Sequence, residues 1–219
     1  NVLEQEYAED GIYVAPGAGA LQAAVTAASD GDKLLVGSGT YDEEVLVTQN
    51  DFSIVGCGAA TDDRPLIIPP ATEVTGRGIR GDSLTNFTVQ SIRVEGQDND
   101  GIRITNSNGV VFRDITGDGK DASAYAVFPQ TCNNVLVELC KLRSTTLPPA
   151  PPADPYPPST RSYNDAPIYV GQSSTVTVRW NDVRDSVAAI EIENCGNSHV
   201  HNNYATRSTA GILVFKDGS

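Results

Sequence analysis

The chain has 219 residues, which suits one large domain or two small ones and is long enough to bury a sizeable core. Its formal net charge of −13 repels nucleic acid and anionic membranes, so neither is an expected partner. The same charge disfavours anionic polysaccharides unless one face is locally basic or cations bridge. There is no run of 18 apolar residues, so no membrane insertion is expected.

The first element in chain order is a short helix over residues 20–29. The segment is rich in strong helix formers, its apolar face includes Leu21 and Val25, and Ser29 to Gly31 end it. Residues 32–47 and 52–56 follow as strands of the opening coils of a repeat structure. Because the end of such a stack exposes apolar core and strand edges, we expect the helix to cap the N-terminal end.

A repeat runs through the rest of the chain. Equivalent positions of successive repeats are Gly78, Gly101, Ala126, Pro167, Ala189 and Gly211. The intervals between them are 23, 25, 41, 22 and 22 residues. The long interval contains the Pro-rich stretch 144–162, and without those 19 residues it becomes 22. We interpret this stretch as a loop insertion in one coil of a solenoid.

Each repeat carries three segments in which alternate residues are apolar, which indicates strands with one buried face. The sequence therefore predicts an all-β, single-domain parallel β-helix over 1–219, with three strands per coil and 22 to 25 residues per coil. Residues 211–215 begin a further coil, so we expect the C-terminal end to be uncapped and suited to dock either on another copy of the chain or on a further domain. In the first segment of each repeat, the two inward positions are Ile79/Gly81, Ile102/Ile104, Val127/Pro129, Ile168/Val170, Ile190/Ile192 and Ile212/Val214.

Several stretches resemble the bacterial parallel β-helix repeat proteins of the pectate-lyase-like superfamily. They are 124–138, 166–183 and 188–215, and residues 11–47 are similar to that family's opening helix and first coil. The resemblance implies a right-handed helix in a secreted or periplasmic protein, often one that handles polysaccharides. The Asp-Pro-His-Asp signature of mannuronan epimerases is absent, and the resemblance assigns no particular reaction.

In enzymes of that superfamily the site lies on the outer face of the first strand of each coil. Read from the repeat, this face runs from basic through aromatic to acidic. The candidate substrate-binding residues are Arg80, Phe128, Tyr169 and Gln130. Aromatic rings flanked by charges suit sugar binding, because a ring offers an apolar face and a polar edge.

The candidate catalytic residues on the same face are Glu191, Glu193, Tyr169 and Arg103. Glu191 and Glu193 point the same way, about 6 to 7 Å apart, near the lower bound for an inverting glycosidase pair. Arg103 is suited to neutralise a uronate carboxylate and Tyr169 to act as acid or base in a lyase. The alternative is that the two glutamates are ordinary surface residues alternating with core isoleucines.

Acidic turns near Asp98, Asp100, Asp118 and Asp121 lie in adjacent coils, where carboxylates and carbonyls suit a shared Ca²⁺. Neither turn has the spacing of a calcium loop, which favours the alternative of solvated turns. We expect no other cofactor and no other metal site. His199 and His201 face outward from a second strand, and two ligands are too few for a metal.

The four cysteines Cys57, Cys132, Cys140 and Cys195 show no metal-binding spacing. Cys132 and Cys195 share a repeat position but lie two coils, about 9.6 Å, apart, which is too far for a disulfide. Cys140 is predicted to face the core.

Two functions remain open. The first is an extracellular protein that binds or processes polysaccharide or a cell-surface glycan, with the reaction unassigned. The alternative is a structural protein that stacks end to end into a rod or filament, without catalysis.

Overall fold

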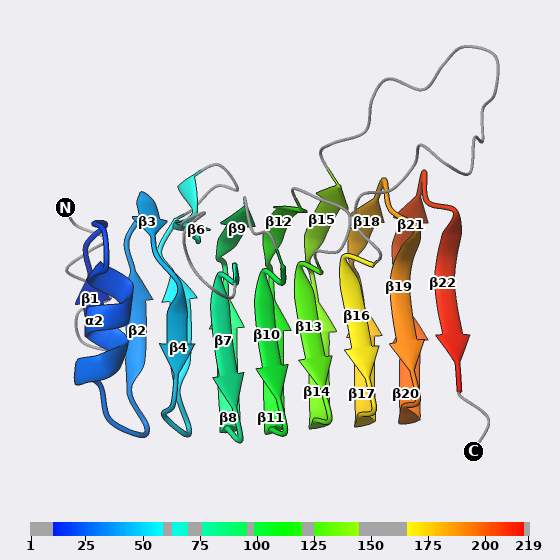
Figure 1. The fold of residues 1–219 in the computed structure, drawn as a ribbon, viewed down its shortest axis with the longest axis horizontal. Coiled ribbons are helices and arrows are strands. Elements are labelled where there is room, and N and C mark those ends of the chain that lie inside the picture. The colour runs from blue at the N-terminus through cyan, green and yellow to red at the C-terminus, as the bar shows by residue number, and fades with distance from the viewer. Residues whose placement is uncertain are drawn as a thin grey trace, which may run out of the picture.

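The computed structural model describes residues 11–58, 63–69, 76–95, 99–119, 125–144 and 166–216. The Pro-rich stretch 145–162 therefore lies outside the described residues. Within them, the strands form three parallel sheets that run the length of a solenoid, with one short helix (Figure 1). This confirms the predicted parallel β-helix.

We name the sheets by the order of strands within a coil. The first sheet contains β4 (Val45–Val47), β7 (Ile79–Asp82), β10 (Ile102–Thr105), β13 (Val127–Gln130), β16 (Ile168–Gly171), β19 (Ala188–Glu193) and β22 (Ala210–Phe215). The second sheet contains β1 (Ile12–Val14), β2 (Lys33–Val36), β5 (Ser53–Gly56), β8 (Thr85–Gln90), β11 (Asn108–Arg113), β14 (Asn133–Glu138), β17 (Ser174–Arg179) and β20 (Gly196–His201). The third sheet contains β3 (Thr40–Asp42), β6 (Leu66–Ile68), β9 (Arg93–Glu95), β12 (Thr116–Gly119), β15 (Lys141–Ser144), β18 (Asp182–Arg184) and β21 (Tyr204–Thr206).

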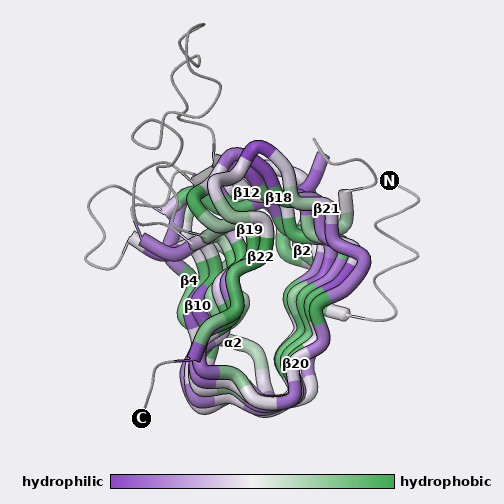
Figure 2. The backbone as a smooth tube through the Cα atoms, turned by 90° about the vertical axis from the view of Figure 1, so that its right-hand side faces the viewer, coloured by the Kyte–Doolittle hydropathy of each residue, from purple (hydrophilic) through white to green (hydrophobic). Residues whose placement is uncertain are grey.

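The strand register confirms the repeat positions predicted from the sequence. In the first sheet, Ile102 pairs with Ile79 on one side and Val127 on the other, and the same column continues through Ile168 and Ile190. These side chains are fully buried. Seen along the axis, the coils superpose into one outline (Figure 2). The core is thus a set of stacked apolar columns, each contributed by the same position of successive coils.

Helix α2 spans Ala20–Ala27 and lies at the N-terminal end of the solenoid, near β1, β2 and β4 (Figure 1). It buries Leu21 and Val25 against the core. It ends two residues earlier than predicted, because Ala28 takes an extended backbone conformation. Glu43 caps the helix from outside: its carboxylate accepts hydrogen bonds from the backbone N–H groups of Leu21 (3.0 Å) and Gln22 (2.6 Å).

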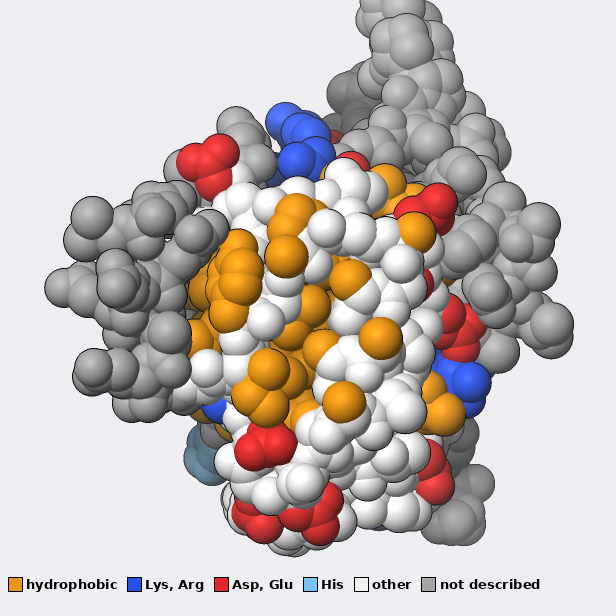
Figure 3. All heavy atoms as spheres, turned by 90° about the vertical axis from the view of Figure 1, so that its left-hand side faces the viewer, with side chains coloured by type: hydrophobic (Ala, Val, Ile, Leu, Met, Phe, Trp, Pro, Cys, Tyr) orange, Lys and Arg blue, Asp and Glu red, His pale blue; other side chains and the backbone are white. Residues whose placement is uncertain are grey.

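Both ends of the described solenoid expose apolar side chains. At the N-terminal end, apolar atoms gather on the surface (Figure 3), and Ile12 and Tyr13 of β1 are exposed. At the other end, Ile212 and Val214 occupy inward columns of the repeat, yet they are 46% and 65% exposed. Within the described residues, no helix is long and apolar enough to cross a membrane.

The cysteines are free thiols. Cys132 and Cys195 lie in one column with Ser173 between them, and the Ser173 hydroxyl accepts a hydrogen bond from the Cys132 N–H at 3.0 Å. Cys140 is fully buried, as predicted, and burial raises the pKa of its thiol to about 12. The thiol of Cys140 is therefore protonated at neutral pH and acts as a packing group.

Candidate functional site

The outer face of the first sheet carries the predicted site residues in two neighbouring columns, one with Arg80, Arg103, Phe128, Tyr169 and Glu191 and the other with Gln130 and Glu193. Arg103 pairs with Arg80 and with Phe128 in the register, and Tyr169 pairs with Glu191. The first of these columns runs from basic through aromatic to acidic along the solenoid axis, as the repeat predicted.

An aromatic cluster occupies the middle of this face. The rings of Phe128 and Tyr169 stack with centroids 4.6 Å apart and an interplanar angle of 11°, and Tyr125 packs against both. The Arg103 guanidinium lies 4.4 Å from the Phe128 ring centroid. Phe128 and Tyr169 are each only 6% exposed, so their ring faces are in contact with protein. The sequence predicts a sugar-stacking surface from Phe128 and Tyr169 here, and the repeat pattern does not reveal Tyr125, because that residue lies before the alternating segment.

Tyr169 presents its hydroxyl at the edge of the cluster, where it donates a hydrogen bond to the carboxylate of Glu193. Gly171 leaves the space for this contact, because a Cβ at that position would lie 2.6 Å from the Tyr169 oxygen. Burial raises the pKa of Tyr169 above its ordinary value, and the hydrogen bond and charge of Glu193 raise it further. The phenol therefore stays protonated at neutral pH and donates a hydrogen bond to Glu193. Glu191, the neighbouring outward residue on β19, is buried at 8% exposure.

A second outward column, which we call the polar row, runs parallel to the aromatic one. It contains Asp82, Thr105, Gln130, Gly171 and Glu193. Gln130 connects its parts: its carbonyl oxygen accepts from Arg103 (3.1 Å), and its amide nitrogen donates to Gln172 (2.8 Å). The row offers amide, hydroxyl and carboxylate groups at the strand spacing, an arrangement that suits the hydroxyls of a chain of sugars.

The Asp82 end of the polar row is fixed by local hydrogen bonds. Thr105 Oγ1 donates to Asp82 at 2.5 Å and Asn106 Nδ2 donates to it at 2.7 Å. These bonds lower the pKa of Asp82 below its ordinary value. Asp82 is therefore a carboxylate acceptor at neutral pH.

The basic residues of the face are engaged by acids. Arg80 forms an ion pair with Glu44, and Arg103 lies 3.2 Å from Asp100. Asp100, one of the acidic-turn residues, is 1% exposed and also contacts Arg77 at 3.0 Å.

The rest of the predicted calcium site is not described. Asp98 and Asp121 lie outside the described residues, and of Asp118 only the backbone is described. No group of three or more potential metal ligands occurs in the part of the chain that the structure describes. The calcium site stays a prediction.

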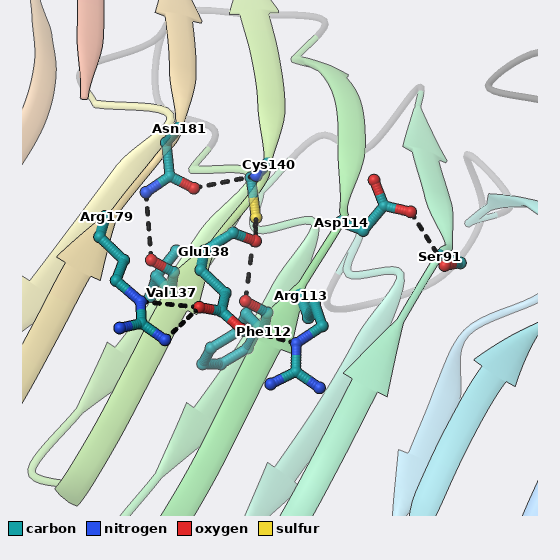
Figure 4. Close-up of polar contacts among 9 residues, drawn as sticks. All are labelled: Ser91, Phe112, Arg113, Asp114, Val137, Glu138, Cys140, Arg179 and Asn181. Carbon is teal, nitrogen blue, oxygen red and sulfur yellow. Dashed lines mark hydrogen bonds and ion pairs between the residues drawn. The ribbon is translucent and has the colours of Figure 1, made fainter. Parts of the chain in front are cut away.

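The second sheet carries a buried ion triad that the sequence did not reveal. Glu138 lies between Arg113 and Arg179 from the two neighbouring coils, with N–O distances of 2.7 and 2.8 Å (Figure 4). Glu138 is only 4% exposed. Burial alone would raise the pKa of Glu138, but hydrogen bonds from Arg113 and Arg179 lower it overall. The triad links the side chains of three successive coils through ion pairs.

We expect Glu138→Gln to reduce the free energy of unfolding by about 1–2 kcal/mol at pH 7. Because the pKa of Glu138 is lowered in the folded state, the stabilisation is complete above the unfolded pKa of about 4.3 and is lost as pH falls through the folded pKa. Urea unfolding at pH 7 and pH 3 measures this, and the difference between the two proteins should shrink at pH 3. Asp42→Asn, at an exposed position, is the control, and a difference independent of pH would contradict the expectation.

His199 and His201 lie on the outer face of the second sheet and are exposed, as predicted. His201 contacts the edge of Trp180 at a centroid distance of 6.4 Å, and the Arg179 guanidinium lies 4.3 Å from the centroid of the same ring. Trp180 is 48% exposed. The two histidines form no metal cluster with other described residues.

The stacked columns, three parallel sheets and N-terminal helix define a parallel β-helix fold. No family model matches the chain, and no curated protein matches it. Among solved structures, an alginate lyase from Paenibacillus sp. str. FPU-7 is similar with a TM-score of 0.53 and 13% identity, covering 87% of this chain and 75% of that one.

Two further structures were found at lower similarity. A pectin methylesterase from Erwinia chrysanthemi has a TM-score of 0.45 and 10% identity, covering 84% of this chain and 64% of that one. A Streptococcus pneumoniae surface protein and adhesin has a TM-score of 0.48 and 12% identity, covering 94% of this chain and 63% of that one.

Proposed function

We propose that the chain binds or processes a polysaccharide in the extracellular or periplasmic space, using the outer face of the first sheet. The observation that carries the proposal is the protonated Tyr169 hydroxyl held on Glu193, beside the buried Glu191 and along the polar row. Such a cluster of one protonated phenol and two carboxyl groups is suited to bind sugar hydroxyls and to transfer protons.

The residues have distinct roles in this proposal. Glu193 accepts hydrogen bonds from sugar hydroxyls, the Gln130 amide of the polar row donates and accepts them, and Arg80 extends the binding surface. Arg103, which lies against the Phe128 ring, is placed to meet a sugar carboxylate. If the chain is an enzyme, Tyr169 supplies the acid and Glu191 and Glu193 supply the carboxylate pair.

The fold supports a polysaccharide as the ligand, although it does not select one. The alginate lyase is a protein of this fold that acts on a polysaccharide, as its name states. Nothing in that likeness transfers a particular reaction to this chain, because one fold hosts many activities.

The test is binding to a panel of neutral and acidic polysaccharides by affinity electrophoresis, followed by product analysis. We expect Glu193→Gln and Tyr169→Phe to weaken retention by the polysaccharide that binds best, by about tenfold each, since each removes a hydrogen bond to a charged group. His199→Gln, on the second sheet, is the control. Retention unchanged in both first-sheet variants would overturn the proposal.

A second candidate function is end-to-end assembly into a rod. The exposed apolar side chains at both ends of the described solenoid favour it, because a strand added in register would cover Ile212 and Val214. Sedimentation velocity over a wide concentration range tests it. Growth that is abolished by Val214→Lys supports assembly, and a monomer at every concentration rules it out.

A further inference from the structure

A hollow of about 280 Å³ lies over the outer face of the third sheet, whereas the proposed polysaccharide site lies on the first. Its walls come from β9, β12, β15 and β18, which lie side by side along the solenoid (Figure 1), and from Arg207 just after β21. The hollow therefore extends along the axis over several coils.

The hollow is basic in an acidic protein. Among the side chains that the structure describes, two acidic ones line it, Glu95 and Asp182. Five basic side chains do so, out of 15 in a chain of net charge −13, and they are Arg93, Lys141, Arg143, Arg184 and Arg207. The local charge is thus opposite to that of the molecule as a whole, which makes this face attractive to an anion.

The strand register explains why the positive charges gather. Lys141 and Arg143 are two residues apart on β15, so both point outward from the sheet. Arg143 pairs with Arg184 of the next coil. Because successive coils lie about 4.8 Å apart, an extended polyanion along the axis meets a basic group at nearly every coil.

The nearby carboxylates leave donors available. Arg93 lies 2.5 Å from Glu95 and Arg184 lies 2.6 Å from Asp182. A carboxylate occupies at most two of the five N–H donors of a guanidinium. Lys141 has no ion-pair partner among the described residues.

A buried hydroxyl in the wall points to a ligand independently of the charges. Thr116 pairs with Arg93 and Lys141 in the register, lines the hollow and is 6% exposed. Its Oγ1 has no hydrogen-bond partner in the described part of the chain. Buried polar atoms are rarely left unpaired, because the missing bond is costly. An anionic oxygen in the hollow would accept a hydrogen bond from this hydroxyl.

An exposed aromatic ring lies beside the basic residues. Tyr204 pairs with Asp182 and is 60% exposed, and the Arg184 guanidinium lies 5.6 Å from its ring centroid. An exposed ring next to anion-binding groups suits a sugar that carries a carboxylate better than it suits a small inorganic anion.

We propose that this hollow binds a carboxylate-bearing polysaccharide laid along the solenoid axis. Lys141 and Arg143 contact its carboxylates, Thr116 donates a hydrogen bond, and Tyr204 packs against a sugar ring. The proposal deepens the proposed function by naming an anionic polysaccharide, and it rests on that function for the choice of sugar. It places the contacts on residues that the first-sheet site does not use.

The experiment is isothermal titration of the full chain with oligogalacturonate, with its methyl-esterified form and with inorganic phosphate. We expect oligogalacturonate to bind, and the double variant Lys141→Glu/Arg143→Glu to raise its Kd by at least about tenfold. The control Lys33→Glu/Lys216→Glu makes the same change in net charge away from the hollow and should leave the Kd within about twofold of the unmodified chain.

Thr116→Val separates binding from folding. The substitution removes a hydroxyl that lacks a protein partner, so the melting temperature should not fall, while the Kd for oligogalacturonate rises several-fold. This variant keeps the proposal testable even if the charge reversal disturbs the fold.

Each result of these experiments either supports or overturns the proposal. No binding of oligogalacturonate, equal binding of its methyl ester, or phosphate competing as strongly as the oligosaccharide would each overturn the proposal. So would a loss of affinity in the control equal to that in the charge-reversed variant. Glu193→Gln and Tyr169→Phe report on the first-sheet site alone, so failure there is distinguishable from failure at the hollow.

Discussion

Phe112→Ala is expected to lower the free energy of unfolding by about 3–5 kcal/mol. Phe112 is fully buried on β11, in a column with Val89 and Val137 of the neighbouring coils. A cavity at this point removes contacts from both neighbouring coils, and a stacked core has no other side chains free to fill it. Urea unfolding followed by far-ultraviolet circular dichroism measures the loss.

Phe112→Leu and Leu46→Ala are the matched variants for this expectation. Phe112→Leu keeps most of the apolar volume and should cost less than Phe112→Ala. Leu46 is 38% exposed on the outer face of the first sheet, so its truncation should cost about 1 kcal/mol or less. Equal losses for Phe112→Ala and Leu46→Ala would contradict the stacked core described here.

Asn181→Leu is expected to cost about 2–4 kcal/mol, although the new side chain is apolar and of similar size. Asn181 is 2% exposed and faces inward at the start of the third strand. Its side chain accepts a hydrogen bond from the Cys140 N–H (2.9 Å) and donates one to the Val137 carbonyl (3.1 Å) (Figure 4). It also donates a hydrogen bond to Asn203 (2.9 Å). Leucine would leave the fully buried Cys140 N–H without a partner.

Asn133→Leu is the control for Asn181. Asn133 lies on the second sheet, is exposed, and accepts a hydrogen bond from the Ser174 hydroxyl at 2.7 Å. Water can replace that partner, so the substitution should change the free energy of unfolding by less than about 1 kcal/mol. If the two leucine variants unfold at the same urea concentration, the buried amide does not stabilise the turn between the second and third strands.

The architecture was predictable because each structural unit repeats in the sequence. Alternating apolar residues identify the buried face of a strand, and a constant interval between repeats places equivalent residues side by side. The pairing of Tyr169 with Glu191, and of Arg103 with Phe128, follows from those two facts alone. The predicted helix was correct in position and two residues too long at its C-terminal end.

The burial of the outward-pointing side chains was less predictable from the sequence. Alternation says that Glu138 and Tyr169 point away from the core, but not that they are buried by the long side chains and rings of neighbouring coils. Whether an outward column is filled or hollow depends on the packing of side chains between coils. Lys141 and Arg143 point outward from the third sheet, and only the structure shows a hollow there.

Trp180 is the only tryptophan of the chain, and it lies near one end of the described solenoid, half exposed beneath the Arg179 guanidinium. In a solenoid each coil contacts only its neighbours, so the end coils can separate before the middle. Intrinsic fluorescence will therefore report fraying of the coils around β18, whereas circular dichroism follows every strand. Transitions that coincide by the two probes would show that the solenoid melts as a single cooperative unit.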